Sequence, residues 1–160
     1  MLRSVYDSGS VHVERRHHHE YSPRHRPDIV VHNHDGRGNM LIIDTSVACP
    51  CAHCHVRAAA NSRLAAALKH EDDKRRVYGP LGPHTLVPFA VETFGAFGPA
   101  AAKLLDDYAR MRHNQLGPEI HAASFTTRSF KTYWRQQLAL GHQRTIGRGL
   151  VARARQDFVP

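Results

Sequence analysis

The stretch that most constrains the fold is residues 40–47, MLIIDTSV, because its apolar residues run together instead of alternating with polar ones. A strand of this kind is buried on both faces of its sheet. Helices must then cover both faces. A chain of 160 residues with 41% hydrophobic content is long enough to build one such domain. The run therefore predicts an α/β fold.

The neighbouring segments predict the rest of a small mixed β-sheet. Residues 28–31, DIVV, form a second strand, joined to the first by HNHDGRGN, whose Asn, Asp and Gly suit a hairpin. Residues 11–14, VHVE, predict a short edge strand. Residues 85–93, TLVPFAVET, predict a buried strand in which Pro88 favours an edge position or a bulge.

Helices are predicted between and after these strands. Residues 56–78 carry an apolar stripe at helical spacing, made of Val56, Ala60, Leu64, Ala67 and Leu68. Pro99 suits the first position of a helix over 100–116. The stretch 125–157 predicts a basic helix weakened by three glycines, Gly141, Gly147 and Gly149. We divide the chain into an irregular polar and basic segment (1–25), an α/β core (26–116) and a basic helical extension (117–160).

The charge of the chain indicates a polyanionic partner. Lys and Arg number 22 against 14 Asp and Glu, for a formal net charge of +8. Such an excess favours a nucleic acid, DNA or alternatively RNA, although a basic protein without such a partner has the same composition. No stretch approaches the roughly 20 apolar residues of a membrane span. The three cysteines form no disulfide framework, so we expect an intracellular protein, nuclear or cytoplasmic.

Two aspartates flank the central hairpin and suggest a metal site. Asp28 opens the first strand and Asp44 closes the second. Mg²⁺ or Mn²⁺ prefers oxygen ligands and often takes only one or two carboxylates from the protein. Lys69 or Lys74 would orient the water or stabilise the phosphate. The alternative is that both acids are ordinary turn residues at strand ends.

The order of these motifs resembles a known family. RPD, a glycine-containing hairpin and IDTS resemble the core of the restriction-endonuclease-like fold, whose pattern is PD…(D/E)xK. More closely, RPDIVV…IDTSVACP…KRRVY…LVPFAVETFG…GPAA resembles the endonuclease-like domain at the C-terminus of certain non-LTR retrotransposon polyproteins. The resemblance spans about residues 26–116. It implies metal-dependent nicking of DNA by a truncated or detached copy of that domain.

The resemblance also assigns roles to residues. Asp28 and Asp44 match the two metal-binding acids, Lys74 the first lysine of K-x-x-K-Y, and Tyr78 its tyrosine. Val77 stands where the second lysine belongs, and Ser46 where (D/E)xK places its lysine. These departures leave two alternatives open: a non-catalytic nucleic-acid-binding module, and an inactive structural remnant.

Arginines supply the expected contacts to a nucleic-acid backbone. Arg26, Arg75 and Arg76 belong to the core, and Arg144 and Arg148 to the basic extension. The guanidinium fork suits phosphate. Alternatively the extension is a solvated helix whose apolar residues, Phe130, Tyr133, Trp134 and Leu138, pack inward.

The segment CPCAHCH offers a second metal candidate. Cys49, Cys51 and Cys54, with His53 or His55, have the residue types of a Cys₃His zinc site. The spacing is too tight for easy tetrahedral geometry, and no distant second pair completes the motif. We therefore expect small residues at a strand-to-helix turn, with Mg²⁺ or Mn²⁺ rather than zinc as the cofactor.

Overall fold

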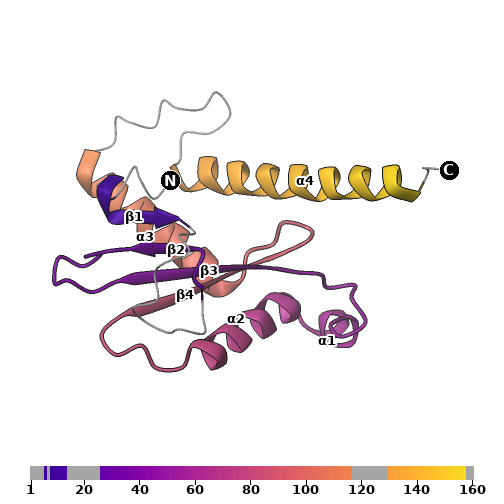
Figure 1. Ribbon diagram of the computed structural model, residues 1–160, viewed down its shortest axis with the longest axis horizontal. Coiled ribbons are helices and arrows are strands. Elements are labelled where there is room, and N and C mark those ends of the chain that lie inside the picture. The colour runs from indigo at the N-terminus through magenta and orange to yellow at the C-terminus, as the bar shows by residue number, and fades with distance from the viewer. Residues whose placement is uncertain (1–5, 7, 14–25, 117–129, 158–160) are drawn as a thin grey trace.

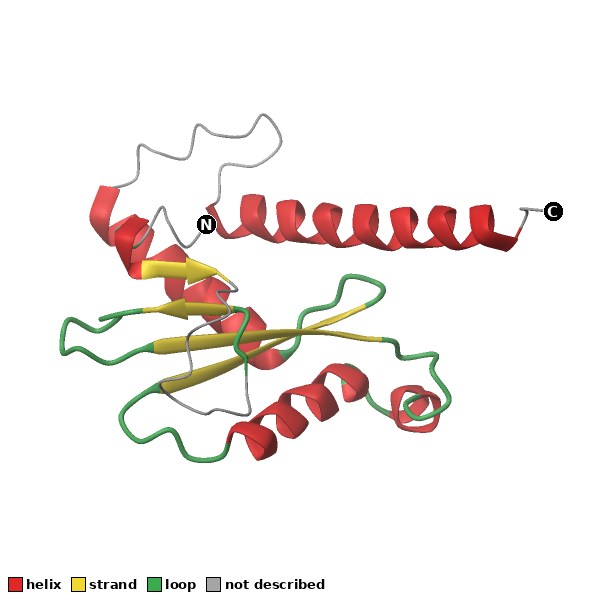
Figure 2. Ribbon diagram, viewed as in Figure 1, coloured by secondary structure: helices red, strands yellow, loops and turns green. Residues whose placement is uncertain are grey.

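The computed structural model describes Tyr6 and residues 8–13, 26–116 and 130–157. A four-stranded sheet forms the middle layer, with α2 (Ala65–Tyr78) on one face and α3 (Pro99–Leu116) on the other (Figures 1 and 2). The segments 14–25 and 117–129, which include most of the predicted N-terminal segment and the start of the predicted extension, lie outside the described residues.

The sheet is mixed, as the sequence predicts. Its spatial order is β1 (Val11–Val13), β2 (Ile29–Val31), β3 (Leu41–Ala48) and β4 (Thr85–Glu92). The first three strands are antiparallel neighbours, and β4 runs parallel to β3. Parallel neighbours need a crossover connection, which here contains α1 (Val56–Asn61) and α2.

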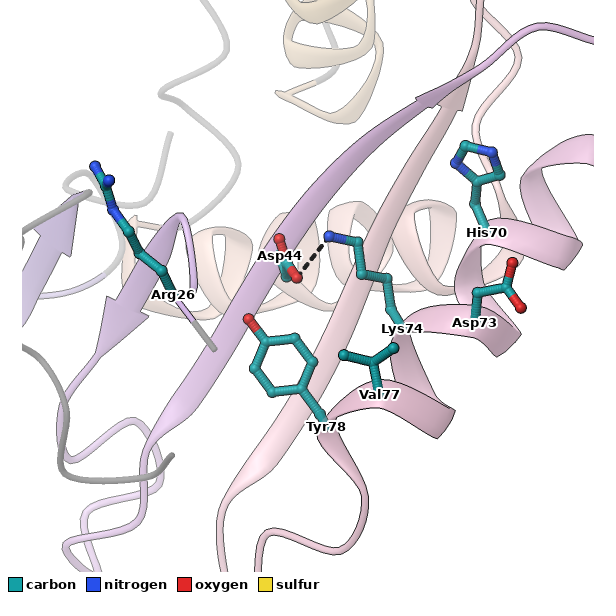
Figure 3. Close-up of a pocket in the computed structure, with 7 residues that line it drawn as sticks. All are labelled: Arg26, Asp44, His70, Asp73, Lys74, Val77 and Tyr78. Carbon is teal, nitrogen blue, oxygen red and sulfur yellow. Dashed lines mark hydrogen bonds and ion pairs between the residues drawn. The ribbon is translucent and has the colours of Figure 1, made fainter. Parts of the chain in front are cut away.

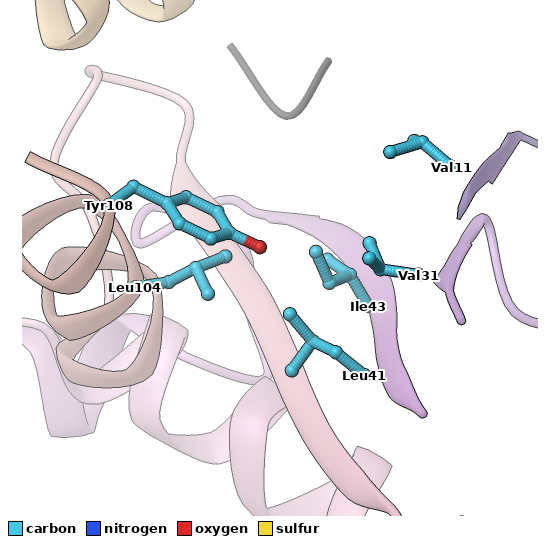
Figure 4. Close-up of a cluster of buried hydrophobic side chains, with 6 residues drawn as sticks. All are labelled: Val11, Val31, Leu41, Ile43, Leu104 and Tyr108. Carbon is cyan, nitrogen blue, oxygen red and sulfur yellow. The ribbon is translucent and has the colours of Figure 1, made fainter. Parts of the chain in front are cut away.

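The first four residues of β3 are all buried, which confirms that this strand is covered on both faces. On the α3 face, Leu41 and Ile43 pack with Leu104 and Tyr108 of α3 (Figure 4). Val31 and Val11 extend this cluster across the two antiparallel strands. Burying each of these aliphatic side chains contributes about 1.5–3 kcal/mol.

The hairpin between β2 and β3 is organised by Asp35. Its Oδ1 accepts hydrogen bonds from the backbone N–H groups of Arg37, at 2.9 Å, and Asn39. Gly36 and Gly38 both adopt positive φ, a conformation that glycine reaches without steric cost. The predicted turn chemistry therefore fixes the register of β2 against β3.

The helix predicted over residues 56–78 is wrong in one respect, because it is broken into α1 and α2. Leu64 adopts a left-handed conformation, with φ of 62°, immediately before α2. The predicted apolar stripe is buried only in part: Ala67 is buried and Leu64 is half-buried, whereas Val56, Ala60 and Leu68 are exposed. The face that α2 buries is made of Ala66, Ala67 and Glu71. The break turns α2 so that this small-residue face lies on the sheet.

Two buried glutamates hold α2 in place. Glu71 Oε1 accepts a hydrogen bond from Ala100 N at the start of α3, at 2.9 Å. Glu92, at the end of β4, accepts one from Ala67 N in the first turn of α2, at 3.4 Å. A carboxylate at a helix N-terminus satisfies free N–H groups and the helix dipole. These bonds tie α2 to β4 and α3.

Strand β4 lies at the edge of the sheet, which confirms one of the two positions predicted from Pro88. Thr85 N donates to Met40 O beside β3, and Ala90 O accepts from Gly98 N on the opposite side. Because backbone groups alternate along a strand, the nitrogen of Pro88 faces outward. The missing donor therefore costs no sheet hydrogen bond.

The basic extension forms one long helix, α4 (Phe130–Asp157). Its first half is attached to the core: Lys131 Nζ lies 2.6 Å from Asp106 Oδ1, and Gln143 Nε2 donates to Thr93 O at 3.0 Å. Its second half extends away from the sheet (Figure 1). None of the helices in the described residues is long and apolar enough to cross a membrane.

Candidate functional site

The sheet register brings the two predicted acids together. Ile29 of β2 pairs with Ile43 of β3. Continuing this antiparallel register by one residue sets Asp28 opposite Asp44. Opposite residues on antiparallel strands point to the same face, and Asp44 reaches Lys74 on α2. Both aspartates therefore belong to the face of the sheet that α2 covers.

Asp44 is held by the lysine that the resemblance assigns to the site. Lys74 Nζ lies 2.7 Å from Asp44 Oδ2 (Figure 3), and only 8% of the aspartate side chain is exposed. Lys74 itself is 30% exposed. The ion pair joins the middle of β3 to the last turns of α2. A buried carboxylate with one cationic partner is thus fixed in position and open on one side to the pocket.

Asp28 has a partner that sequence reasoning did not foresee. Its Oδ2 accepts hydrogen bonds from Thr45 N at 2.6 Å and from Thr45 Oγ1 at 2.5 Å. The carboxylate thus adds side-chain hydrogen bonds to β3 just beyond the last paired residue of β2. These bonds tie the start of β2 to β3.

The hydroxyl of Tyr78 lies close enough to both acids for their charges to affect its pKa. Burial raises the pKa of its hydroxyl above the ordinary value, and negative charge on Asp44, a hydrogen bond with Asp44 and charge on Asp28 raise it further. The hydroxyl therefore stays protonated and donates. In Figure 3 it points toward Asp44 from the end of α2. The tyrosine assigned by the resemblance lies beside the two acids.

Asp44, Lys74 and Tyr78 line a pocket of about 430 Å³ between β3 and α2, and Asp28 is not among its lining residues. Its wall contains Arg26, His70, Asp73 and Val77 in addition to the residues above (Figure 3). His70 and Asp73 were missed from the sequence. The available signal was helical spacing, because His70 stands four residues before Lys74 and shares its side of α2.

The surroundings of His70 favour its neutral form by lowering its pKa. Burial lowers its pKa, and the neighbouring His55 lowers it further. The two rings lie with centroids 5.3 Å apart, and His55 is buried. A neutral imidazole adds hydrogen-bonding capacity to the pocket without adding charge.

The other basic residues predicted for α2 lie outside this pocket. Lys69 Nζ pairs with Asp73 at 3.3 Å, and Arg76 pairs with Asp73 at 2.7 Å. Arg75 pairs with both Glu71 and Asp72. Their charges are balanced on the helix itself, so Arg26 is the predicted arginine that the structure places at the pocket. Arg144 and Arg148 lie on α4, where both are exposed.

The two departures from the family pattern both fall near the site. Val77 lines the pocket and is 51% exposed. Ser46 lies two residues after Asp44, on the same face of β3, and its Oγ is buried. A lysine at either position would have been within reach of the acids, so Lys74 is left as the cation of this pocket apart from Arg26.

The cysteine segment follows β3 as a turn, as predicted. Cys49 is partly buried, whereas Cys51 and Cys54 are exposed, and all three are free thiols. Among the residues that the structure describes, no group of three or more His, Cys, Asp or Glu side chains is arranged to hold a metal ion.

Comparison of the chain with family models, with curated proteins and with solved structures found no match.

Proposed function

We propose that this chain carries a restriction-endonuclease-like core of the retrotransposon type and hydrolyses a phosphodiester bond in DNA with the help of a divalent metal ion. The observation that carries the proposal is the approach of Asp28, Asp44, Lys74 and Tyr78 from three segments of the chain. The mixed sheet, the lysine-bearing helix and the glycine-containing turn after β4 agree with the resemblance.

The acids fit a hard cation by their chemistry. Two carboxylates on one face of the sheet offer oxygen ligands, and Mg²⁺ commonly takes one or two protein carboxylates plus waters and substrate phosphates. Asp28 and Asp44 would hold the ion. When bound, it would activate a water and neutralise charge on the scissile phosphate.

The remaining residues act on the substrate. Lys74, fixed by Asp44, would place its ammonium beside a non-bridging phosphate oxygen and stabilise the charge that develops there. The protonated Tyr78 hydroxyl would orient the Asp44 carboxylate by its hydrogen bond. Arg26, which lines the pocket, would contact a neighbouring phosphate along the backbone.

A second candidate is binding of nucleic acid without cleavage. The observation that favours it is the ion pair itself, because Lys74 occupies Asp44 Oδ2 at 2.7 Å and neither Ser46 nor Val77 supplies another amine. This reading predicts salt-sensitive binding that does not respond to neutralising either aspartate.

A nicking assay on supercoiled plasmid with Mg²⁺ or Mn²⁺ separates the two. The full chain is compared with Asp44→Asn and Asp28→Asn, and with Asp72→Asn as the matched control. Asp72 lies on α2 and is 74% exposed, outside the pocket. Metal-dependent nicking that only the first two variants abolish supports the nuclease. A folded chain that binds but never nicks, or that nicks equally in all variants, overturns it.

A further inference from the structure

An exposed aromatic ring sits on an ordered turn at the carboxyl end of β4. Phe94 is 72% exposed, the highest value among the large hydrophobic residues that the structure describes. Gly95, at φ +88°, closes the turn by donating its N–H to Glu92 O at 2.7 Å. The bond from Gln143 to Thr93 O joins the same turn to α4. The ring is therefore presented to solvent from a fixed position.

A cationic hollow adjoins this turn. A pocket of about 400 Å³ is lined by Gly95 and Phe97 below and by Lys131, Thr132, Arg135 and Gln136 of α4 above. The Arg135 guanidinium carbon lies 5.7 Å from the centre of the Phe97 ring, a distance typical of a cation–π contact.

Arg135 carries the available charge of this hollow. No carboxylate in the described ranges pairs with it, whereas Lys131 is neutralised by Asp106. A planar guanidinium that lies over an aromatic ring is suited to bind a phosphate group.

We propose that this surface, formed by Phe94, the hollow and α4, binds an unpaired nucleic-acid strand. Bases stack on exposed aromatic side chains in many single-strand binding sites, while basic groups follow the backbone. Within a duplex the base faces are covered by their neighbours, so an exposed ring gains little there. The inference rests on the proposed function only for the class of ligand, and the surface uses none of the residues of the nuclease pocket.

Fluorescence anisotropy tests the stacking part. The chain carrying Asp44→Asn, which avoids cleavage, is titrated into short labelled oligo-dT, oligo-U and duplex DNA. Phe94→Ala should weaken binding of the single strands by about 5- to 100-fold and leave duplex binding unchanged. Phe94→Trp should retain binding. Leu150→Ala, which removes another exposed side chain, at 64%, should change neither. Stronger binding of oligo-dT or of oligo-U would identify the natural strand as DNA or RNA.

Salt dependence tests the charged part. Arg135→Gln should reduce the slope of log K against log salt for oligo-dT by about 0.7, the value of one phosphate contact on a single strand. Arg110→Gln, on α3, is the matched control because Arg110 already pairs with Asp107. Phe94→Ala should leave the slope unchanged.

Three results would overturn the inference: no single-strand binding, single-strand binding that ignores Phe94, or an equal loss for the duplex. Circular dichroism confirms that each variant is folded. If plasmid nicking depends on Asp44 and any of these three results is also found, the single-strand inference is wrong and the nuclease proposal stands. Conversely, binding that depends on Phe94 in a chain that never nicks overturns the nuclease alone.

Discussion

Lys74 and Asp44 are joined by a 2.7 Å ion pair across the contact between α2 and β3, and the aspartate side chain is almost fully buried. The Lys74 amine is the cationic partner of this buried carboxylate. Removing the amine should therefore lower the stability of the fold as well as any activity.

We expect Lys74→Met to lower the free energy of unfolding by about 1–3 kcal/mol, since it leaves a buried acceptor without its charged partner. Lys69→Met is the control. Lys69 pairs with Asp73 on the surface, where such pairs contribute about 0.3–0.5 kcal/mol. Urea denaturation measures both. Equal losses would show that the buried pair is no stronger than the exposed one.

Two variants of Asp28 should distinguish its contribution to stability from its contribution to nicking. Asparagine can still accept the hydrogen bonds from Thr45, so Asp28→Asn should keep the stability within about 0.5 kcal/mol, whereas Asp28→Ala should lose about 0.5–1.5 kcal/mol. Both should abolish nicking, because both remove a negative charge from the metal site. Chemical denaturation and the plasmid assay measure the two effects. An active Asp28→Asn chain would contradict the metal role.

Gly98 should tolerate no side chain. A Cβ there would overlap Glu71 Oε1 and approach Ala90 O to 3.3 Å, and the Glu71 carboxylate is held by Ala100 N. We expect Gly98→Ala to destabilise the fold by about 1–3 kcal/mol through overpacking. Gly141→Ala, in open space on α4, should instead favour its helix by about 0.5–1 kcal/mol. Opposite signs in urea titrations are expected, and a loss in both would contradict the packing argument.

His70 should make stability depend on pH. Its pKa is lowered in the folded chain, mainly by burial. The unfolded chain therefore binds a proton more readily, so the stabilisation is complete above the unfolded pKa of about 6.5 and is lost as the pH falls below it. Comparing urea midpoints across this range, we expect the wild-type chain to lose more stability on acidification than His70→Gln. Parallel curves would contradict this.

Much of the sheet could be predicted because its signals are local. The unbroken apolar run predicts the buried strand β3. The Asn and Gly residues predict the hairpin, and the proline predicts the edge position of β4. The break before α2 could not, because residues 61–64, NSRL, contain neither glycine nor proline, and leucine rarely adopts the left-handed conformation that Leu64 has. Tertiary contacts override local propensity at such points.

The motif order indicated which residues come near one another, but not the bonds between them. Asp44, Lys74 and Tyr78 line one pocket, and the strand register sets Asp28 opposite Asp44, while their roles in a site stay a prediction. The bonds from Thr45 to Asp28 depend on the strand register. Those from Ala100 to Glu71 and from Ala67 to Glu92 depend on where distant helices begin. Likewise the pairing of Arg75 and Arg76 with neighbouring acids shows that a basic residue type does not by itself indicate a free charge.

The outward-facing nitrogen of Pro88 affects how copies of the protein can associate through the edge of the sheet. An unprotected edge strand is a template on which a second molecule can add its own strand, and repeated addition leads to fibrils. At β4 that row of donors is interrupted in the middle of the strand. We therefore expect Pro88, which leaves the sheet of one molecule intact, to disfavour the addition of a strand from a second molecule.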